Sequence, residues 1–464
     1  MRTLGLGLKG ATQFCGLMDM PAFLLQTSYD MIVKNIHECV SVVTDKLLKK
    51  ACVEEMNATA EQQGDEHKSD LTVSGDGTWK KRGFTSLFGV TSLIGYYSGK
   101  IIDLLVKSSY CKQCEPWKSH KDTTEYQEWW EEHKDVCSAN HKGSSGKMEV
   151  DAVITMFKRS LEKFQVRFIN YIGDGDSKTY SGILKAAPYG ETEVTKKECI
   201  GHVQKRMGKR LRDIVNNTVE EMKDKNGKTK KKKLLGGKGK LTGKLIDKLT
   251  VYYGLAIRRH CDSVDSMYKA IWASYFHNCS TDKNPQHDNC PIGENSWCSW
   301  QKARALGTWP SYKHDYEALP PDVASAIFPI YEDLSNKKLL ERCVGGFTQN
   351  NNESYNQLIW KITPKIIPAG SKIIEIAANI AAGVFNEGKT SLLYYMSAMG
   401  LSLGPNAHSY VSKEDAERIS ISDARAQGST REGRMARRQQ QLNILDANDE
   451  AEGSSYGAGI DDTI

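Results

Sequence analysis

Three apolar stretches follow one another early in the chain and decide the fold: LTVSGD (71–76), TSLFGVTSLIGYY (85–97) and KIIDLLVKSS (100–109). They are interrupted by glycine and separated by short polar segments, which is typical of consecutive β-strands. The residues before them, 1–60, place apolar side chains such as Ile32, Ile36, Val40 and Val43 at roughly helical spacing. The sequence therefore predicts a helical region followed by a sheet that begins near residue 67.

The elements that follow alternate between helix and strand. A helical stripe starts at Met148, VRFINYIGDGD (166–176) is typical of a buried strand ending in an acidic turn, and SKTYSGILKA (177–186) indicates a helix. A short strand then runs into a basic helix over 192–207, and a last helix, NNESYNQLIWKI (351–362), ends before Pro364. This order resembles an RNase H fold, so we predict an α/β core with a mixed five-stranded sheet and flanking helices.

Two segments interrupt this core. A zinc-binding insert follows the third strand, and a mainly helical insertion with a second Cys/His-rich loop precedes the last helix of the core. The predicted boundaries are 1–66 for the N-terminal helical region, 67–212 for the first part of the core with its insert at 109–146, 213–342 for the helical insertion, 343–415 for the last part of the core with the C-terminal helices, and 416–464 for a polar, disordered tail.

The composition is that of a globular protein. Hydrophobic residues make up 39% and charged residues 26% of the 464 residues. No stretch approaches the ~20 apolar residues that a membrane span needs. The first residues, MRTLGLGLKGATQFCGLMDMP (1–21), are too punctuated by glycine for a secretory signal. We therefore expect a soluble intracellular protein with no membrane partner.

Positive charge is concentrated in two runs, KRMGKRLR (205–212) and KTKKKKLLGGKGK (228–240), in a chain of net charge +6. A polyanion would neutralise these runs and release counterions, which favours nucleic-acid binding. A solvated loop or a nuclear-import signal is the alternative for the second run. The expected DNA contacts are Lys205, Arg206, Lys209, Arg210, Arg212, Lys230, Lys231, Lys232 and Lys233.

Carboxylates stand at the ends of three predicted elements. Asp76 follows the strand in LTVSGDGTW, Asp174 and Asp176 follow another strand in YIGDGDS, and Glu353 begins a helix after an Asn-rich cap. Two neighbouring strand ends and one helix start can bring three carboxylates together. Two Mg²⁺ or Mn²⁺ ions about 3.5–4 Å apart would then activate the attacking hydroxyl and stabilise the leaving oxygen of a phosphodiester. The alternative is that Asp and Gly merely form turns after the strands.

Twelve cysteines in an intracellular chain favour metal binding over disulfides. Cys111 and Cys114 precede His133 and Cys137, with 18 residues between the two pairs. Thiolates and imidazole in a tetrahedral set bind Zn²⁺, and four protein ligands make a closed, structural site. The sequence therefore predicts a structural zinc module over these residues.

Two further Cys/His sets have less regular spacing. One consists of His277, His287, Cys290 and Cys298, with Cys279 competing with His277, and is either a second zinc site or a buried loop with free thiols. The other is Cys199 and His202 at the start of the basic helix. They form half of a further metal site with His260 and Cys261, or they pack beside the carboxylates and orient one of them; the sequence leaves both open.

The chain resembles the transposase domain of the Mutator-like superfamily from about residue 1 to 415. The stretches that carry the resemblance are GLKGATQFCGLMDMP (7–21), SGDGTWKKRGF (74–84), NHKGSSGKME (140–149), YIGDGDSKTY (171–180), ECIGHVQKRMGKRLR (198–212), STDKNPQHDNCPIGENSWC (280–298) and NNNESYNQLIWKITPK (350–365). The resemblance implies an Asp–Asp–Glu triad at Asp76, Asp174 and Glu353, with Asp176 as the alternative to Asp174. It also implies a Cys-x-x-His element at Cys199 and His202.

The resemblance implies a nuclear enzyme that cuts double-stranded DNA at transposon ends and joins it to target DNA. Transposases of this kind act as dimers or larger assemblies. Two other functions compete with this one: a domesticated or decayed transposase that binds DNA or chromatin without cutting it, and a zinc-stabilised interaction protein whose acidic turns are structural. The residues alone predict only a two-metal phosphodiesterase on a basic protein.

Overall fold

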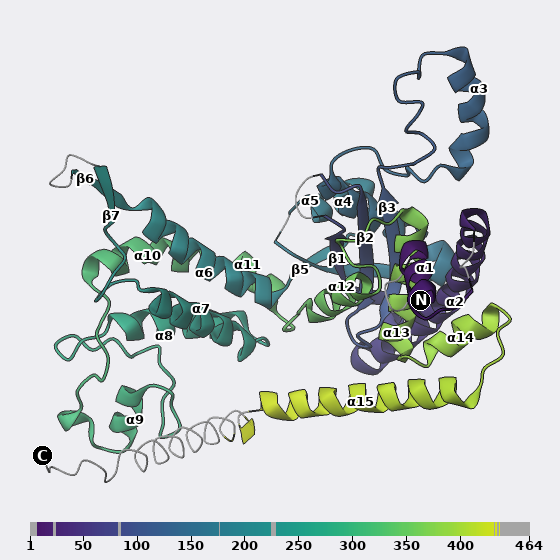
Figure 1. The fold of residues 1–464 in the computed structure, drawn as a ribbon. Helices are drawn as coiled ribbons and strands as arrows, with labels where there is room; N and C mark the ends of the chain where they lie inside the picture. The colour runs from purple at the N-terminus through teal and green to yellow at the C-terminus, as the bar shows by residue number, and fades with distance from the viewer. Residues whose placement is uncertain are drawn as a thin grey trace, which may run out of the picture.

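A mixed five-stranded sheet organises the part of the chain that carries Asp76 and Asp174 (Figure 1). The computed structural model describes residues 7–21, 25–81, 85–175, 177–223 and 229–430, together with 432, 433 and 436. The strands are β1 (Asp70–Trp79), β2 (Phe88–Gly95), β3 (Ile101–Ser108), β4 (Arg167–Gly173) and β5 (Thr195–Glu198), in the order β3-β2-β1-β4-β5. The predicted mixed sheet of five strands is therefore confirmed.

The register of the sheet shows where β1 loses its pairing with β4 while it remains paired with β2. β1 pairs antiparallel with β2 along its second half, from Val73↔Gly95 to Trp79↔Gly89. Its parallel pairing with β4 ends at Ser74↔Ile172. Asp76 thus lies inside β1, and not at its end as the sequence indicated, because β2 continues to pair with the strand beyond this residue. On the β4 side, however, Asp76 comes just after the last paired residue.

Helices cover the sheet on both faces, since every residue of β2 is buried. α4 (Ser145–Phe164) packs on β1 to β4, while α2 (Gln26–Gln63), α12 (Asn350–Ile362) and α13 (Ser371–Glu387) pack together and against β1 and β3. One apolar core unites these elements and includes Leu71, Phe157, Phe168 and Tyr355. The flanking helices of the predicted α/β core are confirmed.

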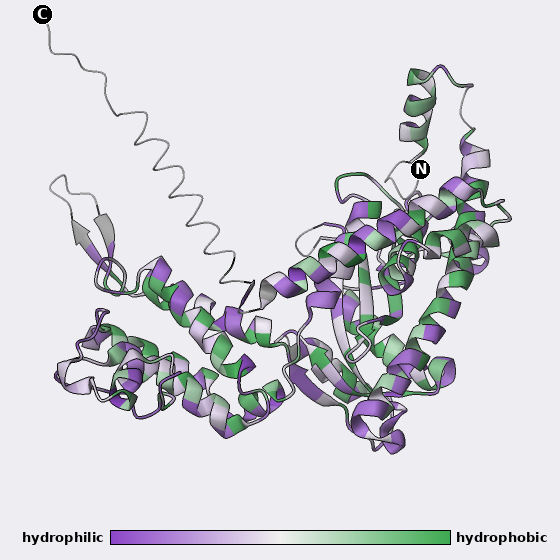
Figure 2. Ribbon diagram, turned by 90° about the horizontal axis from the view of Figure 1, so that it is seen from below, coloured by the Kyte–Doolittle hydropathy of each residue, from purple (hydrophilic) through white to green (hydrophobic). Residues whose placement is uncertain are grey.

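A second apolar core lies in the insertion between β5 and α12, to one side of the sheet (Figure 1). It is built from α6 (Ile200–Asn217), α7 (Gly243–Arg258), α8 (Val264–Cys279), α10 (Pro321–Leu334) and α11 (Lys337–Cys343), with α9 (Ser299–Ala305) beside them. Hydrophobic and hydrophilic residues alternate along these helices (Figure 2), as expected for helices that bury one stripe. The insertion also contains a two-stranded sheet, β6 (Val219–Lys223) and β7 (Thr229–Lys233), where the sequence indicated helix.

The remaining helices are α1 (Leu8–Leu17), α3 (Thr124–His133), α5 (Ser177–Ala186), α14 (Ser391–Ala398) and α15 (Pro405–Ser429). Among the described helices, none combines the length and the apolar character needed to cross a membrane. α3 belongs to the segment between β3 and α4 and stands away from the sheet (Figure 1).

α15 differs from the sequence prediction, which placed a disordered tail at 416–464. Residues 416–429 continue this helix, while 431, 434, 435 and 437–464 lie outside the described residues. The start of α15 is anchored, because Val411 is buried and Asp415 accepts hydrogen bonds from the backbone N–H groups of Lys389 (2.7 Å) and Thr390 (3.0 Å). A helix started in this way propagates through Ala, Arg and Glu, which have high helix propensity.

Candidate functional site

One face of β1 is bonded residue by residue to one face of α12. Side chains two apart share a face of a strand, and side chains four apart share a face of a helix. Two residues of a strand advance about 6.7 Å, and four residues of a helix advance about 6 Å. Every second residue of β1 can therefore lie opposite every fourth residue of α12. The bonds are Ser74 Oγ to Asn352 Oδ1 (2.7 Å), Asn356 Nδ2 to Asp76 Oδ2 (2.8 Å) and Trp360 Nε1 to Thr78 Oγ1 (2.8 Å). This ladder holds α12, which carries Glu353 in its first turn, against β1.

Asp76 is held in an environment that disfavours its charge. Burial raises the pKa of its carboxyl to about 6, although hydrogen bonds from Gly77 and Asn356 and the nearby His202 favour the ionised form. The negative charge of Asp174 raises the pKa further, so the two aspartates are electrostatic neighbours. A cation at this position would relieve both the burial and the repulsion.

The glycines around the two aspartates permit close packing. A Cβ at Gly75 would lie 2.5 Å from the ring of Tyr171 on β4, and a Cβ at Gly175 would lie 2.0 Å from the guanidinium of Arg206 on α6. Asp174 itself is exposed, directly after β4. Asp176, the alternative to Asp174, lies outside the described residues.

His202 joins the carboxylates to α12. Its Nδ1 lies 3.0 Å from Oε1 of the buried Gln349, whose Nε2 donates to the carbonyl of Gly75 (2.8 Å). The Gly75 carbonyl thereby sets the orientation of the amide, so Nδ1 of His202 carries a hydrogen. A hydrogen bond to Cys199 raises the pKa of His202, as does the charge of Asp174.

The Cys199–His202 pair is therefore part of the carboxylate surroundings. The same hydrogen bond lowers the pKa of the Cys199 thiol against the opposing effect of its burial. Among the residues that the structure describes, Cys199 and His202 do not form a metal-binding group with His260 and Cys261. The geometry agrees with the second of the two sequence interpretations, in which this pair packs beside the carboxylates.

Glu353 occupies the first turn of α12 and remains 53% exposed, with Lys205 Nζ 3.5 Å from its Oε1. In the described part of the chain, no group of three ligand atoms within 4.8 Å of one another contains Asp76, Asp174 and Glu353. The structure therefore does not bring the three predicted carboxylates together at one point.

A donor set for hard cations is completed by Asn356. Its Nδ2 binds Asp76, and its Oδ1 is buried without a hydrogen-bond partner. A buried oxygen that lacks a donor costs about 1–3 kcal/mol, and a cation or its bound water would satisfy it. Carboxylate and amide oxygens are the ligands that Mg²⁺ and Mn²⁺ prefer, so the residues present fit such an ion.

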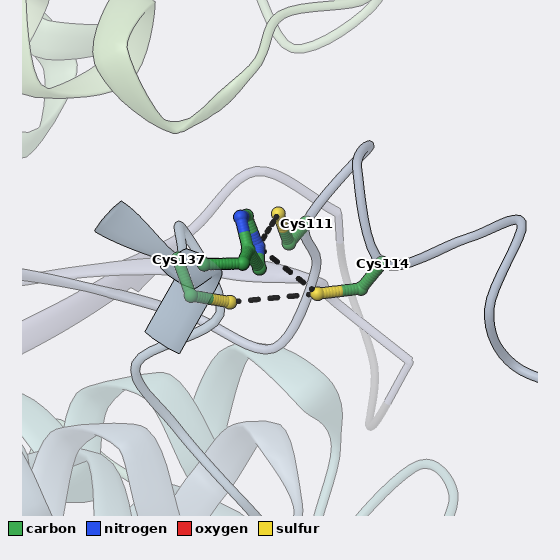
Figure 3. Close-up of side chains that lie close together, drawn as sticks. Cys111, Cys114 and Cys137 are labelled. Atoms are coloured by element: carbon green, nitrogen blue, oxygen red, sulfur yellow. Dashed lines mark hydrogen bonds between the residues drawn. The ribbon is translucent and has the colours of Figure 1, made fainter. Parts of the chain in front are cut away.

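The first Cys/His cluster converges as predicted (Figure 3). His133 Nε2 lies 3.4 Å from Cys111 Sγ and 3.3 Å from Cys114 Sγ, and the sulfurs of Cys114 and Cys137 are 3.5 Å apart. Zinc–ligand bonds of about 2.0–2.3 Å in a tetrahedron separate ligand atoms by roughly 3.5–3.8 Å. The set is therefore compatible with a closed, structural zinc site.

Backbone groups prepare Cys111 to bind metal. Burial alone would raise the pKa of its thiol, but backbone N–H groups of Ser138, Cys114 and Gln113 donate to the sulfur and lower the pKa to about 6. The ring of Trp129 stacks on His133 with a centroid distance of 4.4 Å. The thiolate and the oriented imidazole are the forms that zinc binds.

The second Cys/His cluster also converges, on His277, His287, Cys290 and Cys298. The Nδ1 atom of His287 lies 3.5 Å from Cys298 Sγ and 3.8 Å from Cys290 Sγ. Cys279, the competitor in the sequence, points to Tyr275, and burial raises the pKa of its thiol to about 11. The cluster is compatible with zinc, and His277 rather than Cys279 supplies its fourth side chain.

Polar groups outside the second Cys/His cluster orient the ring of His287. The Nε2 atom of His287 lies 2.9 Å from Ser280 Oγ and 3.0 Å from His314 Nε2, and His314 Nδ1 lies 2.5 Å from the Asp282 carboxylate. Outer-shell partners of this kind fix the ring of a ligating histidine. The sequence analysis missed His314 because it is separated from the cluster by the whole of α9.

The basic residues predicted to contact DNA differ in their surroundings. Arg206 donates to the buried Glu198 (2.5 Å), and Arg210 and Arg212 pair with Asp333 and Asp247. Lys209, Lys232 and Lys233 are exposed, and the side chains of Lys230 and Lys231 lie outside the described residues. Arg206 therefore ties α6 to β5, and Arg210 and Arg212 tie it to α10 and α7 within the insertion, while the exposed lysines supply surface charge.

Gln349, Asn352 and Asn356 were not singled out in the sequence, although they position the start of α12. The sequence pattern that could have indicated them has two parts. Polar residues are two positions apart in SGDGT (74–78), and their partners are four positions apart in α12. That signal becomes visible only when strand and helix are known to be neighbours.

Comparison with protein families identifies the chain. The model of the Mutator-like transposase family matches residues 1–298, so the chain belongs to this family. The matched range includes Asp76, Asp174 and the Cys199–His202 pair and stops before Glu353. Neither curated proteins nor solved structures give a match.

Proposed function

We propose that this protein is a DNA transposase that cleaves and transfers DNA strands by a two-metal mechanism at Asp76, Asp174 and Glu353, on an RNase H-like core. The family membership supports transposition, and the β1–α12 ladder is the observation that carries the site assignment. It links Glu353, outside the range matched by the family model, to the strand that bears Asp76. The strand order β3-β2-β1-β4-β5 with an antiparallel β2 supports the RNase H-like assignment.

In the proposed reaction the chain's own residues bind and orient the ions and the DNA. Asp76, Asp174 and Glu353 would hold two Mg²⁺ or Mn²⁺ ions, which would supply an activated hydroxyl and neutralise the leaving oxygen. Asn356 holds the Asp76 carboxylate through Nδ2, and Gln349 holds His202 with a hydrogen on Nδ1. Lys205, beside Glu353, is placed to contact a phosphate of the DNA.

A nicking assay tests the mechanism. Purified protein with Mg²⁺ or Mn²⁺ should cut labelled DNA, and Glu353→Gln should reduce the rate by about 10²–10³-fold while leaving DNA affinity nearly unchanged. Glu341→Gln, an exposed change of the same chemistry in the insertion, is the matched control. Equal cutting by Glu353→Gln and the parent would contradict the two-metal assignment.

The second candidate function is a domesticated transposase that binds DNA without cutting it. Two ion pairs, Lys205 with Glu353 and Arg206 with Glu198, favour this second function, because they stabilise the site without metal. Tight binding by the parent protein with no cleavage under either metal would support this function in place of the first.

A further inference from the structure

A basic groove of about 650 Å³ opens at the far end of β1, beyond the carboxylates. Four lysines line it: Lys80, Lys81, Lys112 and Lys365. Its apolar lining includes Leu87, Phe88 and Tyr110, and Leu87 is 46% exposed. None of the described residues that line it is acidic. We call this cavity the Lys80 groove.

The Lys80 groove continues the face of β1 that carries the carboxylate. Asp76 and Thr78 share a face of β1, and the alternation continues to Lys80, which follows Trp79 and whose backbone N–H donates to the carbonyl of Phe88 (3.3 Å). Thr78 accepts from Trp360 (2.8 Å), and Lys80 Nζ donates to the carbonyl of Ile367 (2.6 Å), just after α12. Four strand residues span about 13 Å, which sets the separation between Asp76 and Lys80 along the strand.

The chemistry of the groove fits one strand of nucleic acid. Ammonium groups bind phosphates, while aromatic and aliphatic side chains contact sugars and base faces that have left a duplex. A small anion would not use the apolar lining, and an apolar ligand would not use four lysines. Gly370, the first residue before α13, also lines the groove, so the positive end of that helix adds to the lysine charge.

We propose that the Lys80 groove binds an unpaired segment of the DNA strand whose phosphodiester lies at the carboxylate site. A separation of about 13 Å corresponds to roughly four nucleotides of stacked strand, at about 3.4 Å each, and to fewer when the strand is extended. The groove therefore takes nucleotides two to four positions from the scissile bond. This inference rests on the proposed two-metal function for the identity of that bond.

Salt-dependent binding tests the groove without requiring cleavage. The double variant Lys81→Gln/Lys365→Gln removes two exposed lysines of the groove, and Lys34→Gln/Lys413→Gln removes two exposed lysines elsewhere as the matched control. The probe is a fluorescent duplex with a six-nucleotide single-stranded tail, in Ca²⁺, over a range of KCl. The groove variant should lower the salt slope by about 1.4, from about 0.7 per lost single-strand contact, and the control should not. Equal slopes for the two double variants would overturn the proposal.

A second measurement locates the strand. A photo-crosslinking amino acid replaces Leu87 in the groove, and Fe²⁺ with ascorbate marks the nucleotide nearest the carboxylates by radical cleavage. The two marks should lie two to four nucleotides apart on the same strand. Marks more than about six nucleotides apart, or crosslinks to the duplex part alone, would refute the placement.

Failure of the groove proposal and failure of the proposed two-metal function would give different results. Correct marks without metal-dependent nicking would reject the two-metal function and retain the groove as a DNA contact. Nicking that depends on Glu353, with no crosslink from the groove, would reject the groove alone.

Discussion

The carboxylate site and the two Cys/His clusters both consist of metal-ligating side chains, yet the chain holds them differently. In each Cys/His cluster the four ligand atoms lie within 4.8 Å of one another, and in the described chain no such group contains Asp76, Asp174 and Glu353. In the first Cys/His cluster a thiolate at Cys111 lies beside thiols and an imidazole that carry no negative charge, whereas ionised carboxylates repel one another. A closed set suits a permanent structural ion, and an open set suits ions that arrive with a phosphodiester.

Asp76→Asn gives the largest expected effect, and its two consequences have opposite signs. The amide cannot bridge two cations, so DNA cleavage should fall by at least about 10²-fold in a nicking assay. The same change removes a buried charge, so the metal-free variant should unfold at a higher temperature than the parent at pH 7.5, with a gain of about 1–3 kcal/mol. Asp423→Asn, which changes an exposed carboxylate on α15, is the control. A metal-free variant less stable than its parent would contradict the electrostatic argument.

Loss of either Cys/His cluster should destabilise a different part of the molecule. Cys298 is buried with Ala273 of α8, so Cys298→Ser should destabilise the insertion by at least about 2 kcal/mol, or about 4–8 °C in Tm. Cys137→Ser affects the segment around α3, which stands away from the sheet, and should leave the main transition unchanged (Figure 1).

Zinc analysis and calorimetry measure both effects. The parent should contain two zinc ions per chain, and each variant should lose one. Cys39→Ser, a partly exposed cysteine on α2, is the control and should keep both. Equal shifts in Tm for Cys298→Ser and Cys137→Ser would remove the distinction between the clusters.

Metal binding at the carboxylate site should depend on pH in the range set by Asp76. The pKa of Asp76 lies at about 6, above its ordinary 3.8, so protons compete with metal as the pH falls through 6. Mn²⁺ affinity, followed by electron paramagnetic resonance, should weaken about fivefold from pH 6 to pH 5 and level off above pH 7. The stability of the metal-free protein should change with pH in the opposite direction to its Mn²⁺ affinity. Because the pKa of Asp76 is raised in the folded state, that state becomes less stable as the pH rises from 4 to 6. Asp76→Asn should abolish both dependences.

The smallest effect concerns the basic surface beside the carboxylate site. Lys209 is exposed and Arg210 is paired with Asp333, although the two are neighbours on α6. Lys209→Gln should therefore lower the salt slope of duplex binding by about 0.9, the value for one phosphate contact, and Arg210→Gln should lower it less. Anisotropy titrations over 50–200 mM salt measure both slopes. A larger effect of Arg210→Gln would show that its ion pair opens on DNA.

The sequence by itself determined the element order and five strands of the core and the first Cys/His cluster, and it left the second cluster open between a zinc site and free thiols. These features depend on local patterns: apolar period, glycine breaks and ligand pairs three or four residues apart. It determined the three candidate carboxylates only as positions at strand ends and a helix start. Their role remains a prediction, supported by the place of Glu353 beside β1.

Only the tertiary structure decided which distant side chains meet. Asn356 on Asp76, Gln349 on His202 and His314 on His287 are each contacts between elements far apart in the chain. The same holds for the ion pairs that occupy Arg206, Arg210 and Arg212, which a count of positive charges could not anticipate. Local periodicity specifies how each helix and strand forms, but the partner of a polar side chain depends on which elements the two apolar cores bring together.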